Sequence, residues 1–268
     1  AEALLGWGQQ LQLDKQLRAA LVVLEEGIGL TFDGLQLSQL HEAAGRVRLA
    51  LRDYAEARKA FTQAHEYNDE APWPIVGQGK AAYFAEDYDS ARTAFEALIE
   101  TQSDERAVLL ARVGLGLIFE RMARPEDGAR SFDQALTDPD TVRSYLDRYE
   151  FFSEFTAFEH AEADLRRALE IDPKSPEVLN LLAWVSTEYP ADKARLQEAE
   201  ALARKSVELE TQDIARANYL DTLGWVLHLL ERDDQALTYL QQAESLADYD
   251  LQIRHHRQVV EKALKAGV

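Results

Sequence analysis

Apolar residues recur along the whole chain at intervals of three and four, with charged residues between them, which is the spacing of amphipathic helices. One stretch, Asp53 to Ala64, recurs in residue type as Asp87 to Leu98. Within these stretches, Ala57 and Ala91 stand 34 positions apart. A fixed period of that length in a helical pattern predicts an array of stacked helix pairs.

The period divides the chain into seven expected helix pairs followed by one terminal helix. Pro72 and Pro176 open repeats, and Asp138-Pro139 is expected to end the second helix of the fourth repeat, because proline cannot continue a helix. The repeats are expected near residues 1–34, 38–71, 72–105, 109–141, 142–175, 176–212 and 217–250, with a polar capping helix at 251–266.

Composition excludes several classes of protein. The net charge is −19, from 48 acidic and 29 basic residues, so a nucleic-acid phosphate backbone would be repelled. Cysteine is absent, which excludes disulfides, thiol nucleophiles and thiolate metal sites. No apolar run approaches the length of a membrane span, so we expect a soluble protein, without direct membrane insertion, in the cytoplasm or periplasm. Ala1 has no initiator Met or signal core before it and is expected to be the edge of a processed or trimmed chain.

Motifs with catalytic or metal-binding chemistry are incomplete. His41 to Gly45 begins like a zinc-protease helix, but Gly stands where the second His must fall. Gly77 to Lys80 lacks the spacing of a phosphate loop, and its glycines are expected to serve close helix packing. His255 and His256 point about 100 degrees apart on a helix and are expected to be part of the polar cap. No catalytic residue, metal site or cofactor is therefore predicted, and the chain is predicted not to be an enzyme.

Three places of each repeat carry a constant type of side chain. The eighth place holds Gly8, Gly45, Gly79, Gly116, Ala183 and Gly224. The twentieth holds Ala20, Ala57, Ala91, Gly128, Ala161, Ala199 and Ala236. The twenty-fourth holds Leu24, Phe61, Phe95, Phe132, Leu165 and Leu240. These residues resemble the tetratricopeptide repeat, and the segments Leu181 to Trp184 and Leu220 to Trp225 look like those of bacterial members.

The resemblance implies an all-α right-handed superhelix of antiparallel helix pairs that forms a single array over residues 1–268. The small places would let the two helices of a pair approach closely, and the large place would fill the gap beside them. Two repeats depart from the pattern: Tyr149 takes an eighth place and Ala203 a twenty-fourth. The aromatic residues between 145 and 158 are expected to be core.

The resemblance also implies that the first helix of each pair lines a concave groove. Aromatic and arginine side chains there would anchor a partner, although packing between adjacent repeats explains the aromatic ones equally well. Lys80, Arg46 and Arg121 are scattered among glutamates, unlike the set with which chaperone adaptors hold a terminal carboxylate. The candidate groove residues are Arg46, Trp73, Lys80, Tyr83, Phe84, Leu117, Arg121, Arg143, Asn180, Trp184, Asn218, Asp221, Trp225 and His228.

The function implied is that of a non-catalytic scaffold or adaptor that holds a peptide or partner helix in its concave groove. The alternative is the regulatory or substrate-recruiting portion of a larger protein whose catalytic or membrane-anchoring segment lies outside this chain. A hydrolase that uses helix-borne carboxylates would need a deep pocket with paired, perturbed acids, which no pattern here requires. The acidic balance suggests a partner with basic residues around an apolar anchor.

Overall fold

The computed structural model describes residues 1–13, 15–101, 104–189 and 192–266. Over these residues the chain forms fifteen α-helices and a short 3-10 helix, without a strand. In chain order the helices are α1 (Glu2–Leu13), α2 (Leu17–Gly29), α3 (Gly34–Ala50), α4 (Tyr54–Tyr67), α5 (Pro72–Phe84), α6 (Tyr88–Thr101), α7 (Glu105–Arg121), α8 (Pro125–Gln134), α9 (Val142–Glu154), α10 (Phe158–Ile171), α11 (Pro176–Val185), η1 (Ser186–Glu188), α12 (Lys193–Leu209), α13 (Asp213–Leu229), α14 (Asp233–Leu246) and α15 (Leu251–Ala266). The predicted all-α repeat class, seven pairs and a terminal helix, is confirmed.

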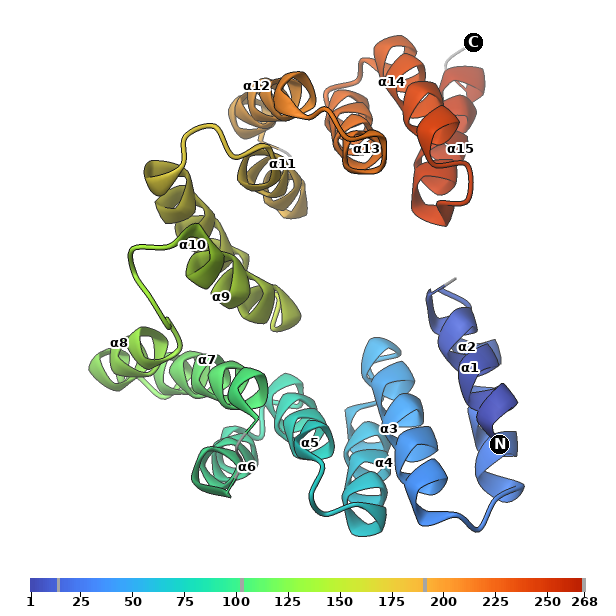
Figure 1. Cartoon of the computed structure of the whole chain (residues 1–268), viewed down its shortest axis with the longest axis vertical. Coiled ribbons are helices and arrows are strands. Elements are labelled where there is room, and N and C mark those ends of the chain that lie inside the picture. Colours follow the sequence, from blue (N-terminus) through green and yellow to red (C-terminus); the bar gives the residue numbers. More distant parts are fainter. Residues whose placement is uncertain (14, 102–103, 190–191, 267–268) are drawn as a thin grey trace. The chain divides into compact units, whose positions relative to one another are not determined.

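The helices belong to two compact units, Ala1–Thr137 and Asp138–Val268, and each is described by itself. In the first unit α1 contacts α3, α3 contacts α5 and α5 contacts α7, so the first helices of successive pairs form a row. In the second unit α11 contacts α13, and α13 contacts α15. Each second helix packs against the first helix of its own pair (Figure 1). A single array over both units stays a prediction.

The contact between the eighth and twenty-fourth places holds the helix pairs together. A Cβ added to Gly45 would lie 2.8 Å from the Phe61 ring, and one added to Gly79 would lie 2.5 Å from Phe95. Both distances are far below van der Waals contact, so only glycine fits. Phe61 also lies against Gly77 of the following pair, which joins neighbouring repeats. The same contact joins Gly8 to Leu24, Gly116 to Phe132, and Gly224 to Leu240.

The turn inside six of the seven pairs has one recurring backbone geometry. After the first helix comes a residue with φ between 54° and 63°, in the left-handed region. The next residue then donates its N–H to a carbonyl five positions earlier, as Asp53 does to Arg48 and Asp87 to Ala82, each at 2.9 Å. This is the Schellman closure, which usually uses glycine. Here the left-handed residues are Lys15, Arg52, Glu86, Ala123, Thr156 and Glu231.

One predicted boundary is wrong. The helix α8 ends at Gln134, four residues before the expected stop at Asp138. The Ala135 N–H bonds to the carbonyls of Ser131 and Phe132, which closes the helix early. Asp138 instead belongs to the turn before α9, where its N–H donates to the Ser144 hydroxyl at 2.9 Å.

The fifth repeat joins its two helices differently. Tyr149 stands at its eighth place and is half-buried. Beside it, Arg148 of α9 donates two hydrogen bonds, of 2.8 and 2.6 Å, to the Asp164 carboxylate of α10. Both partners are largely buried, so this ion pair adds a strong, oriented contact between the helices. The aromatic residues between 145 and 158 are core, as predicted. Phe151, Phe152 and Phe155 are almost fully buried, and Tyr145, Tyr149 and Phe158 are partly buried against the core.

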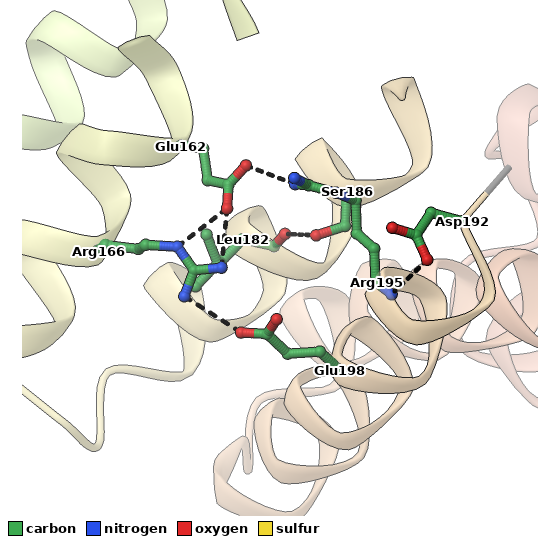
Figure 2. A network of polar contacts seen from close by, with 7 residues as sticks. All are labelled: Glu162, Arg166, Leu182, Ser186, Asp192, Arg195 and Glu198. Atoms are coloured by element: carbon green, nitrogen blue, oxygen red, sulfur yellow. Dashed lines mark hydrogen bonds and ion pairs between the residues drawn. The ribbon is translucent and has the colours of Figure 1, made fainter. Parts of the chain in front are cut away.

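The fifth and sixth repeats are joined by a network of charged side chains (Figure 2). Glu162 of α10 accepts hydrogen bonds from Arg166 on its own helix, at 2.9 Å, and from Arg195 of α12, at 2.6 Å. Arg166 also reaches Glu198 of α12, at 3.1 Å. The partial burial of Glu162 would raise its pKa, but the two arginines outweigh that effect and hold the pKa below its ordinary value of 4.5.

We predict that Gly45→Ala destabilises the protein by about 1–3 kcal/mol, because the new methyl group overlaps the buried Phe61 ring. Gly6→Ala is the matched control, since a Cβ there meets nothing within 4 Å. The control should be neutral or stabilising by up to about 1 kcal/mol through helix propensity. Urea unfolding of the two variants measures both effects, and equal stability of the two would contradict the packing account.

We predict that Glu162→Gln costs about 1 kcal/mol of stability at neutral pH, because the negative charge between two arginines is removed and the amide NH2 cannot accept the hydrogen bond that one of the carboxylate oxygens accepted. A carboxylate with a lowered pKa stabilises the fold above its unfolded pKa, and this contribution is lost as pH falls through the folded pKa. The difference between wild type and variant should therefore shrink below pH 4.5. Urea unfolding over a pH series measures it, and a difference that stays constant would show that the charge of Glu162 is not the cause.

Candidate functional site

The candidate residues all lie on first helices of pairs, as predicted. In the first unit they lie on α3, α5 and α7, and in the second unit on α9, α11 and α13. Their burial divides them. Four are buried, namely Tyr83, Leu117, Asn180 and Asp221. The exposed ones are Arg46, Arg121, Arg143 and Asn218, and the half-buried ones are Trp73, Lys80, Phe84, Trp184, Trp225 and His228.

In the first unit two of the candidate aromatic residues, Tyr83 and Phe84, take part in internal packing. Phe84 stacks on Tyr54 of α4, with ring centroids 5.9 Å apart, and meets Tyr83 edge-on at 5.4 Å. Burial raises the pKa of Tyr83, although Arg121 beside it acts in the opposite direction. A cavity of about 660 Å³ in this unit lies between α4 and α5 and is lined by none of the candidate residues.

In the second unit four candidate residues meet at one cavity of about 320 Å³. Two first helices of pairs, α11 and α13, and the terminal helix α15 contribute to it. We call it the C-terminal cavity, and its lining residues are Asn180, Leu181, Trp184, Asn218, Asp221, Thr222, Asp250, Gln252 and Ile253. Four residues of the predicted groove, Asn180, Trp184, Asn218 and Asp221, therefore line one cavity, and their role in binding stays a prediction.

Helix periodicity and capping position these side chains. Asn180 and Trp184 are one turn apart on α11, so both face the same side. On α13, Asn218 and Asp221 stand three residues apart, which again places them on one face. Asp250 caps the start of α15, where its Oδ1 accepts the N–H groups of Gln252 at 2.8 Å and Ile253 at 3.2 Å.

His256 corrects a prediction, because it is not part of a polar cap. Only 6% of the residue is exposed, and its Nδ1 lies 2.9 Å from both carboxylate oxygens of Asp221. The imidazole stacks on Trp225 at 4.3 Å, and Trp184 lies 6.0 Å away. Burial raises the pKa of Asp221, and His256 opposes that shift. The pair therefore fixes α15 against α13 and places Asp250 at the cavity.

Trp225 and His228 are occupied by internal contacts. The Trp225 ring lies against His256 on α15 and 5.2 Å from His228 on its own helix. His228 in turn has Nδ1 2.6 Å from the Asp233 carboxylate at the start of α14. Packing between helices explains both residues, so the cavity itself depends on Asn180, Trp184 and Asn218 for a binding surface.

Asn180 is the one cavity residue with an unmet polar group. It is 8% exposed, and its buried Oδ1 has no hydrogen-bond partner among the described residues. A buried acceptor without a donor costs about 1–3 kcal/mol, so such groups in native proteins call for an explanation. A ligand that brings an N–H group into the cavity would remove that cost.

The sequence interpretation missed Asp250, Thr222, Gln252 and His256. Asp250 had a detectable signal, since an Asp directly before an amphipathic helix is a favoured N-cap. If the terminal helix had been treated as the first helix of an eighth pair, its start would have been placed beside α13. His256 had no such signal, because its burial depends on Asp221, 35 positions away.

In the part of the chain that the structure describes, no group of three or more His, Asp or Glu residues is placed to hold a metal ion. None of the helices described is both long and apolar enough to cross a membrane.

No protein-family model matches the sequence, and no curated protein matches it. Among solved structures, the chain is similar to a tetratricopeptide repeat protein from Parabacteroides merdae, with 14% identity and a TM-score of 0.47 over 97% of this chain and 98% of that one. It is also similar to yeast Tom70, with 16% identity and a TM-score of 0.48 over 95% of this chain and 60% of that one. A third is the C-terminal part of a TPR repeat-containing protein from Cytophaga hutchinsonii, with 11% identity and a TM-score of 0.45 over 94% of this chain and 98% of that one.

These likenesses concern the fold alone. The predicted repeat class is confirmed by the chain itself, because the glycines of the eighth place meet the large residues of the twenty-fourth across successive helix pairs. The chain is thus an all-α helical repeat protein whose repeat resembles the tetratricopeptide repeat.

Proposed function

We propose that this chain is a non-catalytic scaffold that binds a peptide segment of a protein partner along the first helices of its second unit. Support comes mainly from the C-terminal cavity, where residues chosen from their repeat positions alone line one hollow. Asn180 and Trp184 of α11 face it together with Asn218 of α13. The surface thus combines one aromatic side chain with amide groups.

This combination suits a peptide. An extended chain carries an N–H and a C=O at each residue, and the amides of Asn180 and Asn218 can pair with either group. Trp184 offers apolar area, and aromatic residues dominate the binding energy of interfaces. The buried Oδ1 of Asn180, which has no partner among the described residues, would gain a donor from the ligand.

The test is selection of a random peptide library, displayed on phage, against the whole chain. We expect the selected peptides to lose roughly tenfold or more in affinity for the double variant Trp184→Ala/Asn218→Ala, because truncation of a central aromatic anchor costs about 2 kcal/mol. Fluorescence anisotropy with labelled peptides measures the change.

The matched control is Gln241→Ala/Gln242→Ala on the exposed side of α14. It should bind the peptides as wild type does. Asn218→Ala alone is a second cavity variant, since Asn218 is exposed and its loss leaves the core intact. Circular dichroism establishes that all variants are folded. The proposal is wrong if no peptide is selected, or if the cavity variants bind as tightly as the control.

A further inference from the structure

The charged side chains that line the C-terminal cavity are acidic. Asp221 and Asp250 both line it, and its described lining includes no Lys or Arg. Burial is the main cause of the raised pKa of Asp221; His256, whose Nδ1 lies 2.9 Å from its carboxylate, opposes the shift, and the Asp250 charge adds to it. Asp250 has no such cationic partner among the lining residues. An anionic ligand would therefore be repelled, and a cation would be attracted.

The arginines of the adjoining helix α15 do not neutralise the cavity. Arg257 forms ion pairs with Glu244, at 2.6 Å, and with Glu261. Arg254 pairs with Glu244 at 3.5 Å and donates to the Asp248 carbonyl. These cations are held by groups that do not line the cavity.

The start of α15 does not make the cavity an anion site either. A free helix N-terminus attracts anions through its unpaired N–H groups. Here the Asp250 carboxylate already accepts the N–H groups of Gln252 and Ile253. Both of these contacts use Oδ1. A carboxylate has about four lone-pair sites, so Asp250 keeps acceptor capacity for a ligand.

Asn180 points to the same kind of ligand independently of the carboxylates. Its Oδ1 is buried and has no hydrogen-bond partner among the described residues. An acceptor in this state is satisfied by an N–H donor, and ammonium and guanidinium groups are donors without any acceptor. Trp184 adds an aromatic ring at the same cavity, and cations bind favourably over such rings.

We propose that the C-terminal cavity receives the side chain of a lysine or arginine from the bound peptide, with Asp250 and Asn180 as its acceptors. This inference rests on the proposed function and names the residue type that the scaffold recognises. A volume of about 320 Å³ suits one long side chain, since it stands at the lower end of the roughly 300–1,000 Å³ of small-molecule pockets.

The surroundings of the cavity indicate what lies beside that cation in the peptide. Tyr249 and Leu251 flank Asp250 in the sequence and are 67% and 49% exposed. Ile214, one helical turn before Asn218, is 63% exposed. Exposed apolar side chains next to a charged cavity favour a peptide with an apolar residue close to its lysine or arginine.

The experiment uses the peptides selected against the whole chain, each compared with a copy in which norleucine replaces the lysine at the shared position. We expect the replacement to weaken binding to wild type roughly tenfold, because a desolvated, hydrogen-bonded charge is lost. For the Asp250→Asn variant, we expect the norleucine replacement to weaken peptide binding by less than about threefold, because the carboxylate that pairs with the lysine is already absent. Asn caps a helix about as well as Asp, so this variant keeps the fold of α15.

The matched control is Asp248→Asn, which removes the same charge from the same turn at an exposed residue that does not line the cavity. In this control, the replacement of lysine by norleucine should weaken peptide binding as much as it does in wild type. The inference is overturned if the selected peptides share no lysine or arginine, if norleucine binds as well as lysine, or if Asp250→Asn and Asp248→Asn behave alike. In each of those cases the proposed peptide-binding function is still supported if Trp184→Ala/Asn218→Ala abolishes binding. If no selected peptide depends on these two residues, both the proposed function and the proposed cation site are wrong.

Discussion

The structure depends on the close approach of two helices at a glycine. At the eighth place of a repeat, a Cβ would overlap the large residue of the twenty-fourth place, as at Gly45 against Phe61. The contact recurs in successive pairs, and Phe61 also lies against Gly77 of the following pair. Phe61, which packs against a glycine on each side, thereby sets both the spacing within its own pair and the stacking of the next. The first helices of each unit are arranged in a row as a consequence.

In the second unit, polar contacts join helices that lack the contact between a glycine at the eighth place and a large residue at the twenty-fourth. The fifth repeat carries a buried ion pair between Arg148 and Asp164. The terminal helix α15 is the last helix that the structure describes, so it has no paired second helix there. His256 holds α15 against Asp221 and Trp225 of α13. That last contact is also what completes the cavity, because it fixes the start of α15 beside α13. Packing and binding surface thus share the same residues.

The regular part of this fold could be predicted from the sequence because a fixed period brings residues of one type into register. Glycines such as Gly79 and aromatic residues such as Phe95 were placed correctly from their positions alone. The turns could not be predicted, because residues such as Thr156 adopt the left-handed conformation that usually signals glycine. His256 was misplaced because its burial depends on a single charged partner far away in the sequence.

For the site, position in the repeat predicted which side chains share a surface, but not which of them are occupied by internal contacts. Trp184 and Trp225 stand at equivalent places of α11 and α13, yet Trp225 is packed between His256 and His228. Trp184 lines the cavity together with Asn180. The difference arises from α15, which follows only one of the two repeats and breaks the equivalence that the period implies.

The most direct measurement for the account is nitrogen-15 NMR of the side-chain amides and indole groups while a selected peptide is added. The account predicts that the Asn180 and Asn218 amides and the Trp184 indole shift first and in proportion to the peptide bound. Signals from α12 and α14 should stay in place. Shifts confined to those second helices, with Asn180 and Trp184 unchanged, would contradict the assignment of the binding surface.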